Sequence, residues 1–191
     1  MRNHKIDILK GFAAISVIAG HAVQRGIVVG YNDHILYKLI YTFHMPLFML
    51  LSGYVFFIST KEYNWYLIWK KVKRLIIPTF VWSYLLFFIK DFTFTGLLPF
   101  VKFPDTLEKY TQLLIKRPEF VIWFLYIVFI NMVIITLGKM YFKKIFIIYL
   151  IIIYLMIFQS NVIYFGIHRL KVYMPIFIVG YYIPKYKIFQ Y

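Results

Sequence analysis

Ionisable side chains interrupt the first two long apolar segments of the chain. Lys10 and His21 lie in the first segment, and His44 lies in the second. A charged or titratable group is costly inside hydrocarbon, so such residues usually mark a functional site. An imidazole exchanges protons near neutral pH and can act as a general base. These residues therefore indicate proton or group transfer inside a membrane.

The spacing of the first three candidate residues puts them on one face of a helix. Eleven positions separate Lys10 from His21, and at 100° per residue the two side chains point within roughly 20° of each other. They lie about 16 Å apart along the axis, which is half of a bilayer core. Arg25 follows one turn beyond His21. We expect a cation near the membrane surface and an imidazole well inside.

The second apolar segment is expected to return across the membrane after a turn around residues 30–33. At 1.5 Å per residue, His44 then lies about 8 to 13 Å from that surface and His21 about 10 Å from it. The two imidazoles are expected to meet at one level. For His21 we favour catalysis over a buried neutral histidine, whereas for His44 a functional and a purely structural role stand equal.

The composition excludes a soluble globular protein. Hydrophobic residues make up 62% of the 191 positions and aromatic residues 23%, and the mean hydropathy is +0.74, so too little remains for a water-facing surface. The net charge of +15 does not indicate nucleic-acid binding, because the 22 Lys and Arg residues form short clusters between apolar segments. The absence of cysteine excludes disulfides and thiolate chemistry. No metal-binding motif is present, so no metal is expected.

Apolar segments predict an all-α integral membrane protein with about six transmembrane helices, forming one domain over residues 1–191. The predicted spans lie near residues 8–28, 36–59, 75–92, 120–138, 145–160 and 172–184. With the N-terminus inside, thirteen of the 22 basic residues lie on the inner side. The positive-inside rule therefore places both termini in the cytoplasm. The connection 93–119 is expected outside, with an interfacial amphipathic helix that begins near Thr106.

Several short motifs follow one another along the chain. A basic residue and, after ten positions, a histidine (Lys10 to His21) precede FHMPLF and SGY in the second segment. Further along come KKVKRLIIPTFVW at residues 70–82, IWFLY at 122–126 and YMPIFIVGYYI at 173–183. In this order they resemble the acyltransferase-3 family of multi-pass membrane O-acyltransferases, over nearly the whole chain.

The resemblance implies transfer of an acyl group, commonly acetyl from acetyl-CoA, to a hydroxyl of a cell-surface glycan or lipid-linked sugar. His21 and His44 would be the catalytic residues, and Lys10 and Arg74 would contact the phosphates of the donor. The donor is a substrate, so no permanently bound cofactor is expected. The family usually has arginine where Lys10 stands, and lysine lacks its bidentate fork. Asp7, one turn before Lys10, offers that lysine an alternative role as an ion-pair partner.

Three further residues are expected to support the acceptor or the fold. Arg25 lies one turn beyond His21 on the same face of the predicted helix. Gly53 and Ser52 are expected to permit close helix packing, with an interhelical hydrogen bond from Ser52. This role is favoured over a serine nucleophile, because no carboxylate lies in these spans to complete a triad. Trp123 is either part of an aromatic belt, which we favour, or a platform for a sugar ring.

Other functions remain open. Members of the family usually have about ten spans, so the chain would represent the N-terminal part of the architecture, and a non-catalytic or truncated subunit is the first alternative. A homo-oligomer or a partner protein would then supply further helices. A small transporter is the second, because intramembrane histidines also line proton paths. His168, Arg169 and Lys171 in the last outer loop are either contacts for an anionic acceptor or a solvated cluster.

Overall fold

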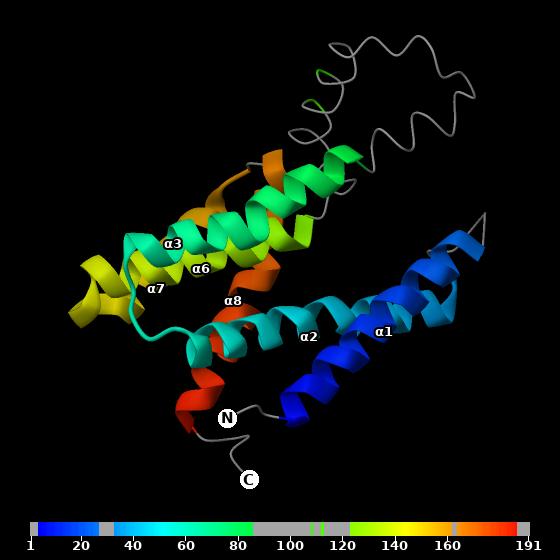
Figure 1. The fold of residues 1–191 in the computed structure, drawn as a ribbon, viewed down its shortest axis with the longest axis horizontal. Helices are drawn as coiled ribbons and strands as arrows, with labels where there is room; N and C mark the ends of the chain where they lie inside the picture. The colour runs from blue at the N-terminus through cyan, green and yellow to red at the C-terminus, as the bar shows by residue number, and fades with distance from the viewer. Residues whose placement is uncertain are drawn as a thin grey trace. The chain divides into compact units, whose positions relative to one another are not determined.

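The computed structural model describes residues 4–26, 33–85, 108, 112, 123–161 and 164–186, without the side chains of residues 24, 25 and 164–166. All regular structure in this part is helical (Figure 1). The elements are α1 (His4–Gly26), α2 (Ile35–Ser59), α3 (Trp65–Lys71), the π-helix η2 (Val72–Ile76), α6 (Trp123–Tyr141), the 3-10 helix η4 (Lys143–Ile145), α7 (Phe146–Gln159), the 3-10 helix η5 (Tyr164–Arg169), α8 (Leu170–Tyr182) and the 3-10 helix η6 (Ile183–Tyr186). Residues 77–85 continue η2 as α-helix.

Each of the six predicted spans contains a helix, but the described helices differ in length. Three are long and apolar enough to cross a membrane: His4–Val23, Ile35–Ser59 and Trp123–Tyr141. By contrast α7 has 14 residues and α8 has 13, which corresponds to about 20 Å against a core of about 30 Å. The all-helical class and three membrane-spanning candidates are therefore established, and the remaining spans and the side of the termini stay predictions.

The chain divides into two compact units. The first comprises Met1–Lys61 together with Pro175–Tyr191, and the second comprises Glu62–Met174. The boundary falls inside α8, at a proline within the helix. Each unit has its own helix packing.

In the first unit α1 packs against α2. The rings of Phe12 and Phe43 stack at a centroid distance of 5.7 Å. Gly20 makes a second close approach, because a Cβ there would lie 3.0 Å from the ring of Tyr41 and 3.2 Å from Ile40. A side chain at position 20 would require the side chains of Tyr41 and Ile40 to shift near the predicted histidine site.

The closest helix crossing of the first unit joins α2 to the end of α8. A Cβ on Gly53 would collide with the carbonyl oxygen of Phe177 and lie 2.8 Å from the backbone nitrogen of Tyr181. A Cβ on Gly180 would collide with the carbonyl oxygen of Leu50. The prediction that Gly53 permits close helix packing is confirmed, and Gly180 is its counterpart on the other helix.

In the second unit the helix of residues 65–85 packs along α6. Asn64 caps its start, since its side-chain oxygen accepts a hydrogen bond from the backbone N–H of Leu67 at 2.8 Å. The two helices are joined by the edge-to-face contact of Phe80 and Tyr126, at 5.8 Å. These contacts hold the KKVKR segment on a continuous helix.

A proline inside α8 explains a hydrogen bond to the neighbouring helix α7. Pro175 has no N–H, so the carbonyl of Lys171, four residues earlier, loses its helical donor. The hydroxyl of Tyr154 donates to that carbonyl at 3.1 Å. The second unit thus satisfies a backbone acceptor that would be costly to leave unpaired in an apolar environment.

Candidate functional site

His44 is buried in α2, with only 3% of its surface exposed. Its Nδ1 lies 2.7 Å from the carbonyl oxygen of Ile40. A carbonyl oxygen can only accept a hydrogen bond, so Nδ1 carries the proton of this bond. In the neutral ring Nε2 is then left with its lone pair. His44 is therefore held in the tautomer that accepts a proton or a hydrogen bond at Nε2.

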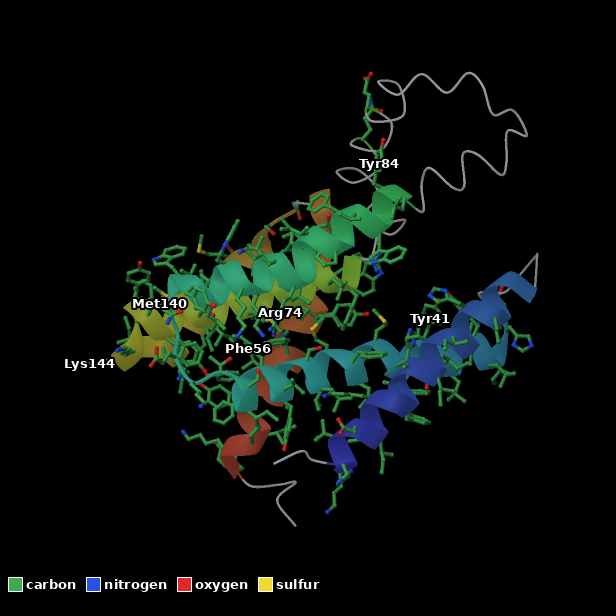
Figure 2. All side chains as sticks on the ribbon, viewed as in Figure 1. Tyr41, Phe56, Arg74, Tyr84, Met140 and Lys144 are labelled. Carbon is green, nitrogen blue, oxygen red and sulfur yellow. The ribbon has the colours of Figure 1, made fainter. Side chains whose placement is uncertain are left out.

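His21 on α1 and His44 on α2 lie within range of an electrostatic interaction. The Tyr41 ring lies edge-on to His44, with centroids 4.6 Å apart, and it also meets Gly20, the residue before His21. The imidazoles of His21 and His44 are close enough for their charges to interact. Figure 2 labels Tyr41 in the region where α1 and α2 lie together. This charge interaction is the one observation that relates to the prediction that the two imidazoles meet at one level.

His21 and His44 differ in environment. His21 is exposed on α1, whereas His44 is enclosed. Tyr41 is a residue of this site that the sequence reasoning missed. The available signal was its position three residues before His44, which puts both side chains on one helix face.

Lys10 lies on α1, about three turns before His21. Its Nζ is 3.9 Å from Oδ1 of Asp7, and 43% of the lysine side chain is exposed. The alternative ion pair suggested by the spacing is therefore present. A pair of this exposure contributes at most about 1 kcal/mol, so a phosphate could replace the carboxylate at little cost.

The supporting residues of the first unit are less defined. The side chain of Arg25 lies outside the described part of the chain. Ser52 is half-buried next to Gly53. No hydrogen bond of its hydroxyl is found among the described residues, so the predicted interhelical bond is not seen there.

Arg74 lies in the second unit, on the π-helix η2, and is exposed. The N–H of Ile77 bonds to the carbonyl of Val72, five residues back. Pro78 explains this local change, because it lacks the N–H that would bond to the carbonyl of Arg74 in an α-helix. Short π-helical turns of this kind frequently occur at functional sites. Lys10 and Arg74 belong to different units.

Lys71 is a basic neighbour of Arg74, three residues before it on the same continuous helix. Burial lowers the pKa of Lys71, and the charges of Arg74 and Lys70 lower it further. Clustered cations of this kind favour an anionic ligand, because an anion relieves their mutual repulsion. The signal in the sequence was the three-residue spacing from Arg74, which places both on one helix face.

Trp123, at the start of α6, has an aromatic and cationic environment. The guanidinium of Arg169 lies 4.2 Å from the centre of the indole ring, and the ring of Tyr173 lies 5.4 Å away. The cation–π contact joins Trp123 to the basic cluster predicted near residues 168–171. Arg169 is therefore held against an aromatic ring.

The predicted outer segment 93–119, including Thr106, lies outside the described residues except for Glu108 and Gln112. These two are helical, and Gln112 donates a hydrogen bond to Glu108 at 3.2 Å. Across the described ranges no group of three His, Asp or Glu residues is arranged to hold a metal ion.

Comparison with known proteins gives a consistent family assignment. A family model for an acyltransferase domain, that of the acyltransferase-3 family, matches residues 3–190. Nodulation protein NolL of Mesorhizobium japonicum is 30% identical over 139 residues, which are 70% of this chain and 35% of that protein. Nodulation protein NolL of Sinorhizobium fredii is 42% identical over 57 residues, which are 28% of this chain and 16% of that protein. No solved structure matches. The chain thus spans about a third or less of the length of these relatives.

Proposed function

The chain belongs to the acyltransferase-3 family, and we propose on this premise that it transfers an acyl group, acetyl from acetyl-CoA, to a hydroxyl of a cell-surface glycan or a lipid-linked sugar. The pair of imidazoles on α1 and α2 carries the proposal. A neutral imidazole takes the proton of the attacking hydroxyl. A site inside the bilayer keeps out water that would hydrolyse the thioester.

In the proposed reaction His21 accepts the hydroxyl proton of the acceptor. The oxygen then forms a bond to the acyl carbon, the C–S bond of the thioester breaks, and the departing CoA thiolate takes up the proton. His44, with its proton on the side of the Ile40 carbonyl, presents Nε2 to the site. Its role is to position and polarise the reacting groups.

The donor is held by cations at a distance from the histidines. Lys10 precedes His21 by about 16 Å along α1, a span that the flexible pantetheine arm of CoA can bridge. We assign phosphate contacts to Lys10 and to Arg74, with Lys71 adding charge beside Arg74. Clustered cations suit the phosphates of CoA.

The acceptor is assigned to the surface formed by Trp123, Arg169 and Tyr173. An indole ring with a guanidinium stacked on it combines an apolar platform with a positive charge. This combination suits a sugar that carries a carboxylate or a phosphate.

Purified protein is expected to bind acetyl-CoA and to move labelled acetyl to a membrane glycan fraction, and Lys10 variants test the donor contact. Lys10→Arg should retain or improve donor affinity, because arginine keeps the charge and adds a bidentate fork. Lys10→Glu should lower it at least about tenfold through repulsion of phosphate. Isothermal titration with acetyl-CoA measures the affinity.

Lys5→Glu is the matched control, since it reverses a charge on the same helix. Equal donor affinity of all the variants would show that Lys10 does not bind the donor and contributes only to the orientation of the chain in the membrane. Donor binding without transfer by the wild-type chain would instead favour the second candidate, a non-catalytic membrane subunit of the same architecture.

The proposal also requires a defined orientation, with both termini in the cytoplasm and residues 93–119 outside. Thr106→Cys introduces a single thiol into a chain without cysteine. We expect an impermeant maleimide to label it in intact cells, whereas Ser59→Cys, at the end of α2 on the predicted inner side, should be labelled only after lysis. The reverse pattern would overturn the topology and the side from which the donor enters.

A further inference from the structure

A basic hollow lies at the turn between α6 and α7, away from every residue assigned above. Its volume is about 430 Å³. Figure 2 shows Met140 and Lys144 together at this end of the two helices. The hollow is lined by Met140, Tyr141, Phe142, Lys143, Lys144 and Ile145.

The lining combines exposed apolar walls with two uncommitted cations. Tyr141 and Ile145 are more than half exposed. Lys143 and Lys144 are exposed as well, and neither forms an ion pair or hydrogen bond with another described residue. Lys139 differs, because its ammonium group lies 4.1 Å from the ring centre of Phe146. Two lysines are thus available to an anionic ligand.

An apolar surface on α7 begins directly at this hollow. Seven large apolar side chains of this 14-residue helix are more than half exposed within the described structure. They are Ile147, Ile148, Ile151, Ile152, Leu155, Met156 and Phe158. At 1.5 Å per residue the helix is about 21 Å long, which exceeds the depth of one leaflet. A surface of this composition is stable only against hydrocarbon or another apolar surface.

Exposed aromatic residues lie beside the hollow. The indole of Trp65 donates a hydrogen bond to the hydroxyl of Tyr141 at 3.3 Å, and both side chains are more than half exposed. Trp69 is exposed on the same helix as Trp65, with Lys73 near its ring, 5.3 Å from the centre. Exposed Trp and Tyr beside Lys are typical of the membrane–water interface.

We propose that this hollow binds the headgroup of an anionic phospholipid. Lys143 and Lys144 contact the phosphate, and the acyl chains lie along the exposed face of α7. The apolar continuation of the site favours a lipid over a free phosphate compound, because a phospholipid carries both the charge and the hydrocarbon, whereas a free phosphate compound carries the charge alone.

The test measures lipid binding to the full chain, purified in detergent and delipidated. Native mass spectrometry with added phosphatidylglycerol or phosphatidylcholine gives the retained lipid. The wild-type protein should retain more phosphatidylglycerol than phosphatidylcholine. The pair Lys143→Gln and Lys144→Gln should weaken its binding roughly ten- to thirty-fold, whereas the pair Lys143→Arg and Lys144→Arg should preserve it.

Lys61→Gln with Lys185→Gln is the matched control, because it removes the same charge from exposed positions outside the hollow. If the control pair weakened phosphatidylglycerol binding as much as the pair in the hollow, the effect would come from net charge alone, and the proposal would be overturned. Unchanged binding in the glutamine pair would overturn it too. Displacement of phosphatidylglycerol by coenzyme A would overturn the lipid assignment and show that the hollow binds the donor.

Discussion

His21→Gln is expected to abolish acyl transfer while the protein stays inserted and folded. Glutamine keeps polarity and hydrogen bonding but cannot exchange a proton near neutral pH, so the general base is lost. General-base catalysis commonly contributes at least about 100-fold, and we expect a loss of this size or more. Transfer of labelled acetyl from acetyl-CoA to a membrane glycan fraction measures it, with titration of acetyl-CoA to show that donor binding persists.

His44→Gln should leave partial activity, about a tenth of wild type. The amide of glutamine can still donate to the carbonyl of Ile40, so the buried position stays satisfied, but the ring lone pair at Nε2 is lost. His4→Gln is the control, because it makes the same change at an exposed position on α1.

Full activity of the His21→Gln variant would contradict the assignment of His21 as the general base. Loss of transfer in His44→Gln alone would exchange the two roles and make the buried imidazole the base. The pH profile separates catalysis from structure: removing a catalytic base should change the pH dependence of transfer, whereas a merely destabilised protein should keep the profile of the wild type.

Gly53→Ala and Gly180→Ala are expected to break the crossing of α2 with the end of α8. The added methyl group at either position would meet backbone atoms, which cannot rotate away as a side chain can. The cost should therefore reach about 3 kcal/mol, the upper end for overpacking. Unfolding of the purified protein in mixed detergent and SDS, followed by circular dichroism, measures the loss.

Alanine variants of two further glycines serve as comparisons for this loss of stability. A Cβ at Gly11 would have no neighbour within 4 Å, so Gly11→Ala should change stability by no more than about 1 kcal/mol, in the stabilising direction. Gly138→Ala would meet the rings of Phe146 and Tyr149 at 2.6 Å, and because rings can shift its effect should be intermediate. Equal stability of Gly53→Ala and Gly11→Ala would show that the crossing is looser than the structure indicates.

Much of the helical architecture was predictable because it depends on local pattern. Among the described residues, long apolar segments identified α1, α2, α6, α7, α8 and the helix over 77–85, since hydrocarbon requires that backbone polar groups be satisfied within the segment. Their exact ends were less predictable: the span predicted near 145–160 is the helix α7 (Phe146–Gln159), and the span predicted near 172–184 begins two residues earlier, as α8 (Leu170–Tyr182). The ends of these helices involve prolines and 3-10 turns, where a hydropathy pattern is a poor guide.

The candidate site was predictable as a set of residues, but not as an arrangement. The eleven-residue spacing singled out Lys10 and His21, and the order of the motifs pointed to the acyltransferase-3 family that the family match confirms. The tautomer of His44 was not predictable, because it depends on the 2.7 Å approach of its ring to the Ile40 carbonyl. Rotamers of this kind are decided by packing.

The membrane class, the family and the close-packing role of Gly53 follow from the sequence alone, because hydropathy, motif order and the size of a residue are properties of the chain. Three pairings emerge only in the folded protein: Gly180 faces α2, Arg169 stacks on Trp123, and Tyr154 satisfies the carbonyl of Lys171. These pairs are separated by between 17 and 130 residues. Which helix faces meet over such separations is decided by the packing of all side chains together, and no local pattern encodes that choice.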